Sequence, residues 1–181
     1  MFTLRCTRKL LRRIGATPSS EAIAPSTVLG DWYANLLYTR PTQLVLAMSE
    51  RSLLAVVVPA APLHTLPERL RTQVEELLGA IGVPPESVAR EVEAMREVSV
   101  GTTASRAVLG CMNDAVVQLQ AYPRGGPGEL PALVDLELHL AENIYSLTEH
   151  QTPWMRTLEL FGVQGAVRVG RVRRVPQGWL H

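Results

Sequence analysis

Apolar residues in the first third of the chain fall into short runs with the spacing of β-strands. The first run, Phe2 to Cys6, alternates apolar and polar side chains. Three more runs follow one another closely, at Trp32 to Thr39, Gln43 to Met48 and Leu53 to Val58. Short links favour antiparallel neighbours, so these three runs predict a meander. Ala55 to Val58 is apolar on both faces, which predicts a central strand covered by helices.

Further along the chain, apolar residues recur at helical spacing between turn residues. The clearest helix begins at Thr65 and Glu68, which have the spacing of a capping box, and ends at Gly82. A second helix restarts at Pro84 and forms a helical hairpin with the first. Residues 8–14 are predicted to form a short helix that is capped by Thr7 and ended by Gly15. Three further helices are predicted at 105–120, 133–142 and 153–161.

These elements predict an α+β fold in which a small, mainly antiparallel sheet, a meander, packs against several α-helices. The chain has 181 residues, and a chain of this size can bury roughly 70% of its unfolded surface. We expect a single domain over 1–162. Residues 163–181 alternate valine with arginine and are predicted to form a basic C-terminal strand or tail.

Hydrophobic residues make up 46% of the chain and charged residues 19%, as in globular proteins. Cys6 and Cys111 share no metal-ligand or redox spacing, and we expect both to be free, buried thiols. The basic start of the chain lacks the apolar stretch of a signal peptide, and no apolar run approaches the length that spans a bilayer. We therefore expect a soluble, cytoplasmic protein without a membrane segment.

The net charge of +1 is unevenly distributed. Residues 1–13 and 165–181 contain nine basic residues and no acid. The part of the chain between them contains the other nine basic residues and all 17 acids, which gives it a net charge of −8. The basic ends could bind nucleic acid or could dock onto acidic groups of this chain or a partner. The candidate nucleic-acid-binding residues are Arg8, Lys9, Arg12, Arg13, Arg168, Arg171, Arg173 and Arg174.

The most distinctive segment runs from Ser105 to Asp114. On a helix, Arg106, Gly110, Asn113 and Asp114 fall on one face. Glycine costs up to ~1 kcal/mol relative to alanine inside a helix, so its use here predicts a close approach to the backbone. Such a polar notch could hold a ligand or partner. Alternatively, a neighbouring strand packs closely on Gly110 while Arg106 pairs with Asp114 or with a strand end.

A second polar group lies in the strand that begins near Trp32. Asp31, Tyr33 and Asn35 would share one face of that strand, with Trp32 opposite. A buried amide needs hydrogen-bond partners, so Asn35 is either a satisfied core residue or part of a pocket shared with Arg106 and Asn113. Trp32, although it lies opposite, is also kept as an aromatic candidate for the binding site at the polar helix face.

Three segments give the sequence a family resemblance: Leu4 to Leu11, Leu29 to Leu36, and Ser105 to Asp114; Glu50 to Leu54 fits more loosely. On these segments the chain resembles an uncharacterised bacterial family, the domain of unknown function 6933, over roughly residues 1–160. The resemblance implies a fold group and no reaction.

Familiar catalytic motifs do not occur in the sequence. The glycines at 125–128 lack the Lys-Ser/Thr of a phosphate-binding loop, and the esterase and zinc-protease motifs are missing. The four histidines are scattered, so we expect no metal and no cofactor.

Three functional hypotheses remain open. The first is a non-enzymatic binding or regulatory module with a protein partner, centred on Arg106, Asn113 and Asp114. The second is nucleic-acid binding through the basic termini. The third is an enzyme that uses the same helix face with Asn35 or His139, which requires these groups to converge on one pocket.

Overall fold

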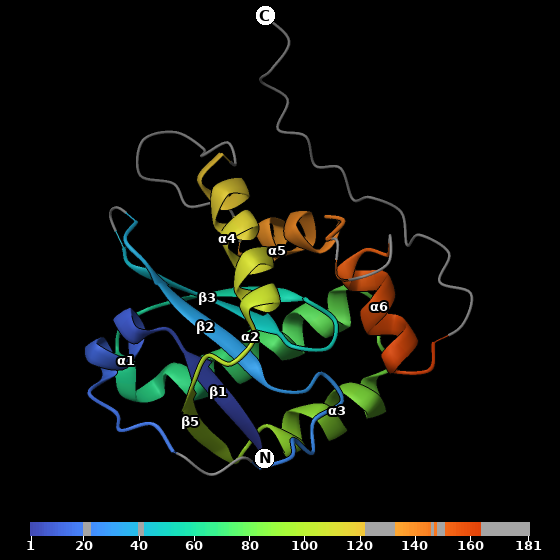
Figure 1. The fold of residues 1–181 in the computed structure, drawn as a ribbon. Helices are drawn as coiled ribbons and strands as arrows, with labels where there is room; N and C mark the ends of the chain where they lie inside the picture. Colours follow the sequence, from blue (N-terminus) through green and yellow to red (C-terminus); the bar gives the residue numbers. More distant parts are fainter. Residues whose placement is uncertain (20–22, 40–41, 122–132, 146, 148–150, 164–181) are drawn as a thin grey trace, which may run out of the picture.

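The computed structural model describes the chain except residues 20–22, 40–41, 122–132, 146, 148–150 and 164–181 (Figure 1). The described residues form a five-stranded sheet, six α-helices and one short 3-10 helix. The strands are β1 Phe2–Cys6, β2 Trp32–Leu37, β3 Leu44–Ser49, β4 Ala55–Pro59 and β5 Val98–Thr102. The helices are α1 Arg8–Ile14, η1 Leu63–Thr65, α2 Leu66–Ala80, α3 Pro85–Ala94, α4 Arg106–Ala121, α5 Leu133–Ala141 and α6 Pro153–Leu160.

The sheet has the order β4-β3-β2-β1-β5 and is mixed. The predicted meander is confirmed, since β2, β3 and β4 pair antiparallel. The prediction of a mainly antiparallel sheet is wrong for the other two strands, because β1 pairs parallel with both β2 and β5. A helix lies between β1 and β2 in the chain, and such a crossover brings the next strand back in the same direction. The α+β class is confirmed.

The strand β4 lies at the edge of the sheet, so its predicted central position is wrong. Its apolar character on both faces has another reason: Val56 and Val58 pack in one core cluster and Ala55 and Val57 in the other. This edge is covered by α5, where Glu137 Oε1 accepts a hydrogen bond from the Val57 N–H at 2.6 Å. A buried edge of this kind does not invite pairing with another chain.

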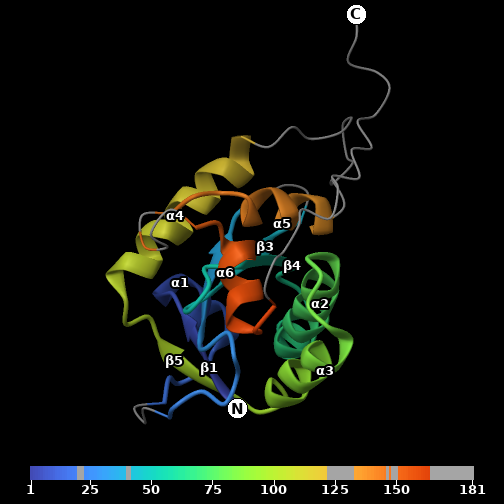
Figure 2. The same cartoon turned by 90° about the vertical axis from the view of Figure 1, so that its right-hand side faces the viewer.

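Two hydrophobic clusters cover the two faces of the sheet. On the first face, here called the α2 side, α1, α2, α3 and α6 pack on Leu4, Trp32 and Val56. On the other face, the α4 side, α4 and α5 pack on Tyr33 and Leu46. Figure 1 looks onto the α4 side, with α4 in front of the sheet and α2 behind it, and Figure 2 shows α4 and α5 grouped apart from α2 and α3.

The predicted helix ends are largely confirmed, but not every predicted cap forms. Gly15 ends α1 with φ 67°, in the left-handed region that favours glycine. The Ser105 Oγ accepts a hydrogen bond from the Val108 N–H at 3.3 Å and caps α4. By contrast, neither Thr7 nor Thr65 makes a side-chain capping bond. The Thr7 hydroxyl donates to Asn35, and the Thr65 hydroxyl donates to the Pro62 carbonyl oxygen and accepts a hydrogen bond from Arg69.

Both cysteines are free and buried, as predicted. Cys6 belongs to the cluster on the α2 side and Cys111 to the cluster on the α4 side, so the sheet separates them. The basic C-terminal strand or tail predicted for 163–181 lies outside the described residues, apart from Val163. The single domain predicted over 1–162 stays a prediction. None of the described helices combines the length and the apolar character that a bilayer crossing requires.

Candidate functional site

The polar face expected between Ser105 and Asp114 is the outer face of α4. Val108, Cys111, Met112 and Ala115 are buried against the α4 side of the sheet. The residues at the complementary positions are exposed: Arg106, Gly110, Asn113, Asp114 and Val117. The helical spacing therefore places the predicted groups on one surface, and that surface faces solvent.

Gly110 does not serve the close contact within the chain that the sequence suggested. A Cβ atom built at Gly110 meets no atom within 4 Å in the described part of the chain. The alternative, in which a neighbouring strand packs on Gly110, is therefore wrong for the described residues. The expected pairing of Arg106 with Asp114 is also absent from the ion pairs that join described residues. The packing of the described residues would accept alanine at position 110.

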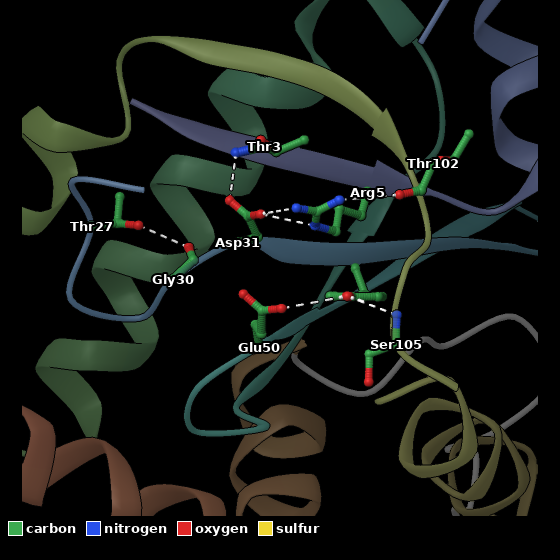
Figure 3. A network of polar contacts seen from close by, with 9 residues as sticks. Thr3, Arg5, Thr27, Gly30, Asp31, Glu50, Thr102 and Ser105 are labelled. Carbon is green, nitrogen blue, oxygen red and sulfur yellow. Dashed lines mark hydrogen bonds and ion pairs between the residues drawn. The ribbon is translucent and has the colours of Figure 1, made fainter. Parts of the chain in front are cut away.

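Beneath the start of α4 lies a buried polar cluster centred on Asp31 (Figure 3). The Asp31 side chain is 2% exposed, and its Oδ2 lies 2.7 Å from Arg5 Nη2 and 2.8 Å from Arg5 Nε. Its Oδ1 accepts a hydrogen bond from the Thr3 N–H at 2.9 Å. Arg5 also donates from Nη1 to the Thr102 carbonyl oxygen at 3.4 Å. These contacts join β1, the beginning of β2 and the end of β5.

Tyr33 extends this cluster to α4. Its hydroxyl oxygen accepts a hydrogen bond from the Ser105 N–H at 3.1 Å and lies 3.5 Å from Glu50 Oε1. Burial and, to a lesser extent, the nearby Glu50 carboxylate raise the pKa of Tyr33 above its ordinary value. Tyr33 is therefore a neutral phenol at physiological pH and holds the first turn of α4 against β2.

A groove opens beside this turn. It has a volume of about 390 Å³ and lies between the start of α4, the β3–β4 turn and the segment that includes α6. Its lining combines charged, polar and apolar side chains: Glu50, Arg51, Leu53, Ser105, Ala107, Val108, Leu147, Gln151 and Arg156. Residues from three distant segments meet here, and no local pattern in the sequence indicated it.

The structure does not bring Trp32 and Asn35 into this groove. Trp32 is fully buried on the α2 side of the sheet, opposite α4, so its predicted place beside the polar helix face is wrong. Asn35 shares the other strand face with Tyr33, but its Oδ1 accepts a hydrogen bond from Thr7 Oγ1 at 3.1 Å. The pocket that would join Asn35 to Arg106 and Asn113 does not form, because those two side chains lie on the outer face of α4.

The convergence that the enzyme hypothesis required is therefore missing. His139 is exposed on α5 and, like Asn35 and Arg106, does not line the groove. Among the described residues, no three histidine, cysteine or acidic side chains gather as ligands for a metal ion.

Two buried glutamates lie outside the groove and serve the backbone. Burial raises the pKa of Glu137 to about 8 although Val57 and Gln73 donate hydrogen bonds to it. Burial likewise raises the pKa of Glu91, which accepts hydrogen bonds from the Val28 and Leu29 N–H groups. Each carboxyl group satisfies the backbone of a neighbouring segment, so neither is available as a general acid or base in the groove.

The candidate nucleic-acid-binding residues are only partly described. Arg8, Lys9, Arg12 and Arg13 are all exposed on α1. The four arginines at 168, 171, 173 and 174 lie outside the described residues.

The segments on which the family resemblance rested meet around Asp31, Tyr33 and Ser105 (Figure 3). A family model described as a domain of unknown function, number 6933, matches residues 3–156. The chain belongs to this family. The part of the chain that matches family 6933 includes all of α4 and the whole lining of the groove, up to Arg156. A search of the curated proteins and of the solved structures found no match.

Proposed function

We propose that this chain is a protein-binding module whose docking surface is the outer face of α4. The observation that carries the proposal is Gly110, an exposed glycine in the second turn of a 16-residue helix with open space above it. Glycine lowers helix stability by about 0.5–1 kcal/mol relative to alanine at such a position. A partner that must approach the helix backbone closely would explain why a glycine occupies this position.

The proposed occupant is a helix of another protein. Small residues let two helix backbones approach more closely than the usual 8–10 Å between axes. Val117 is 65% exposed two turns after Gly110 and would add apolar contact to the same stripe. Arg106 lies one turn before Gly110, and Asp114 lies one turn after it. The partner helix should therefore present an acidic side chain opposite Arg106 and a basic side chain opposite Asp114.

The position of α4 is fixed before any partner binds. The Tyr33 hydroxyl holds the Ser105 N–H, and Arg5 holds the Thr102 carbonyl oxygen at the start of the β5–α4 connection. Four buried residues of α4 pack on the sheet from the inner face. A surface that is ordered in advance loses less entropy on binding, which favours a docking role.

The test uses two matched glycine substitutions. Gly110→Ala and Gly79→Ala each add one methyl group at an exposed glycine in a helix, with no atom within 4 Å of the new Cβ. Proteins captured from the native host by the wild-type chain would be identified, purified and titrated by calorimetry. We expect Gly110→Ala to weaken binding of the true partner and Gly79→Ala to leave the affinity unchanged.

Larger changes sharpen this experiment. Gly110→Leu should abolish binding, and Arg106→Ala combined with Asn113→Ala should weaken capture with little change in Tm, because these side chains are exposed. The proposal is wrong if every partner binds Gly110→Leu as tightly as the wild-type chain. A large loss of Tm in the double variant would instead give these residues a structural role.

A further inference from the structure

Helix α1 carries a cationic surface that the proposed function does not use. Its side chains divide in two: Leu10 is buried in the core on the α2 side, whereas four cations are exposed. The spacing of Arg8, Lys9, Arg12 and Arg13 puts them on one side of the helix. The helix contains no acidic residue, and none of the four makes an ion pair with another described residue.

An exposed aromatic ring lies at the border of this surface. Tyr38 follows the last residue of β2 and is 67% exposed. Lys9 Nζ lies 4.6 Å from the centroid of its ring, which is a cation–π distance. The contact holds the ring beside the four cations while leaving most of its area open to solvent.

The residue that precedes α1, Thr7, is fixed to β2 by two hydrogen bonds. The Thr7 N–H donates to the Ala34 carbonyl oxygen at 2.9 Å, and the Thr7 hydroxyl donates to Asn35 Oδ1 at 3.1 Å. Asn35 thus positions α1, and with it the cations, against the strand that leads to Tyr38. The cationic and aromatic groups therefore form one ordered surface.

We infer that this surface binds single-stranded nucleic acid, with phosphates on the four cations and an unpaired base stacked on Tyr38. Four exposed cations without a nearby acid on their helix suit a polyanion rather than a single carboxylate. An exposed tyrosine ring offers a stacking platform that accepts any base, and only unpaired bases present their faces to it. This site is separate from the outer face of α4.

The test measures binding of the full chain to labelled 12-nucleotide oligothymidylate and oligouridylate by fluorescence anisotropy over a range of salt concentrations. Arg12→Ala combined with Arg13→Ala should reduce the slope of log K against log salt by about 1.4, since each lost phosphate contact is worth about 0.7 for single strands. Tyr38→Ala should weaken binding roughly 5- to 150-fold with an unchanged slope. Tyr38→Phe keeps the stacking face and should bind like the wild-type chain.

A matched charge control is Arg90→Ala combined with Arg96→Ala, which removes two exposed arginines elsewhere and should leave binding unchanged. Circular dichroism and Tm confirm that each variant is folded. The inference fails if the chain does not bind these strands, if the Arg12/Arg13 variant keeps the wild-type slope, or if Tyr38→Ala binds normally. Equal affinity for duplex DNA, or for vesicles containing phosphatidylserine regardless of Tyr38, would also overturn it.

Discussion

The hydroxyl group of Tyr33 accepts a hydrogen bond from the backbone N–H of Ser105, 72 residues further along the chain. This bond satisfies a donor at the start of α4, where backbone N–H groups lack partners within the helix. It also fixes the helix that carries the proposed docking surface to the middle of the sheet.

Removing this hydroxyl should loosen the start of α4. We expect Tyr33→Phe to lower the free energy of unfolding by about 1 kcal/mol, because the Ser105 N–H loses its acceptor in a partly buried place. Urea denaturation measures the change. Tyr38→Phe is the control. Because Tyr38 is largely exposed, this variant should have the same urea midpoint as the wild-type chain. Equal midpoints for the two variants would argue against a role for the Tyr33 hydroxyl.

The ion pair between Arg5 and Asp31 should matter far more than an ion pair at the surface. Asp31→Ala leaves the Arg5 guanidinium and the Thr3 N–H without their acceptor, and we expect a loss of about 3–5 kcal/mol in unfolding free energy. Glu93→Ala removes the exposed partner of Arg96 and should cost at most about 1 kcal/mol. Chemical denaturation of both variants tests the contrast, which would be refuted by similar losses.

Glu137 should make stability fall with rising pH. Burial raises its pKa in the folded chain to about 8 from an ordinary value of 4.5. A raised carboxyl pKa means that folding favours the protonated form, so its contribution is largest below about pH 4.5 and is lost as the pH rises through about 8. The expected loss is on the order of a few kcal/mol.

The variant Glu137→Gln isolates this effect. A glutamine can still accept the Val57 N–H and face the Gln73 amide, but it cannot ionise. Its Tm relative to the wild-type chain should therefore rise steadily between pH 5 and pH 8.5. A difference in Tm that stays constant over this range would mean that Glu137 does not titrate there. The pKa of Glu91 is also raised by burial, but both chains contain Glu91, so its effect cancels in the difference in Tm.

The helix glycine at position 110 should be replaceable without loss of stability. Because a Cβ atom there meets no described atom within 4 Å, Gly110→Ala should raise the free energy of unfolding by about 0.5–1 kcal/mol. Thermal denaturation measures this, with Gly79→Ala expected to give a smaller gain, because Gly79 lies in the last turn of α2. A loss of stability in Gly110→Ala alone would show that something in the chain does pack on this glycine, and would remove the basis of the proposed docking surface.

Local patterns in the sequence were sufficient to predict the helices and strands and the polar face of α4. The turn spacing of Arg106, Gly110, Asn113 and Asp114 depends only on the helix repeat, and the structure has these residues on one exposed face. The alternation in β2 likewise separated Trp32 from Tyr33, and the two residues belong to opposite core clusters. The mistake was to expect Trp32 near the helix face, since its strand face points away from α4.

The sequence by itself determined the helical and strand spacing of the apolar residues, the turns and the α+β class. These follow from each residue's own conformational preferences and those of its close neighbours. Only the tertiary structure decided that β1 lies between β2 and β5, that Arg5 meets Asp31, and that Lys9 lies over Tyr38. Such contacts depend on which strands pair and in which direction. That choice is made by burying two faces of one sheet at once, a requirement of the whole chain that no short segment contains.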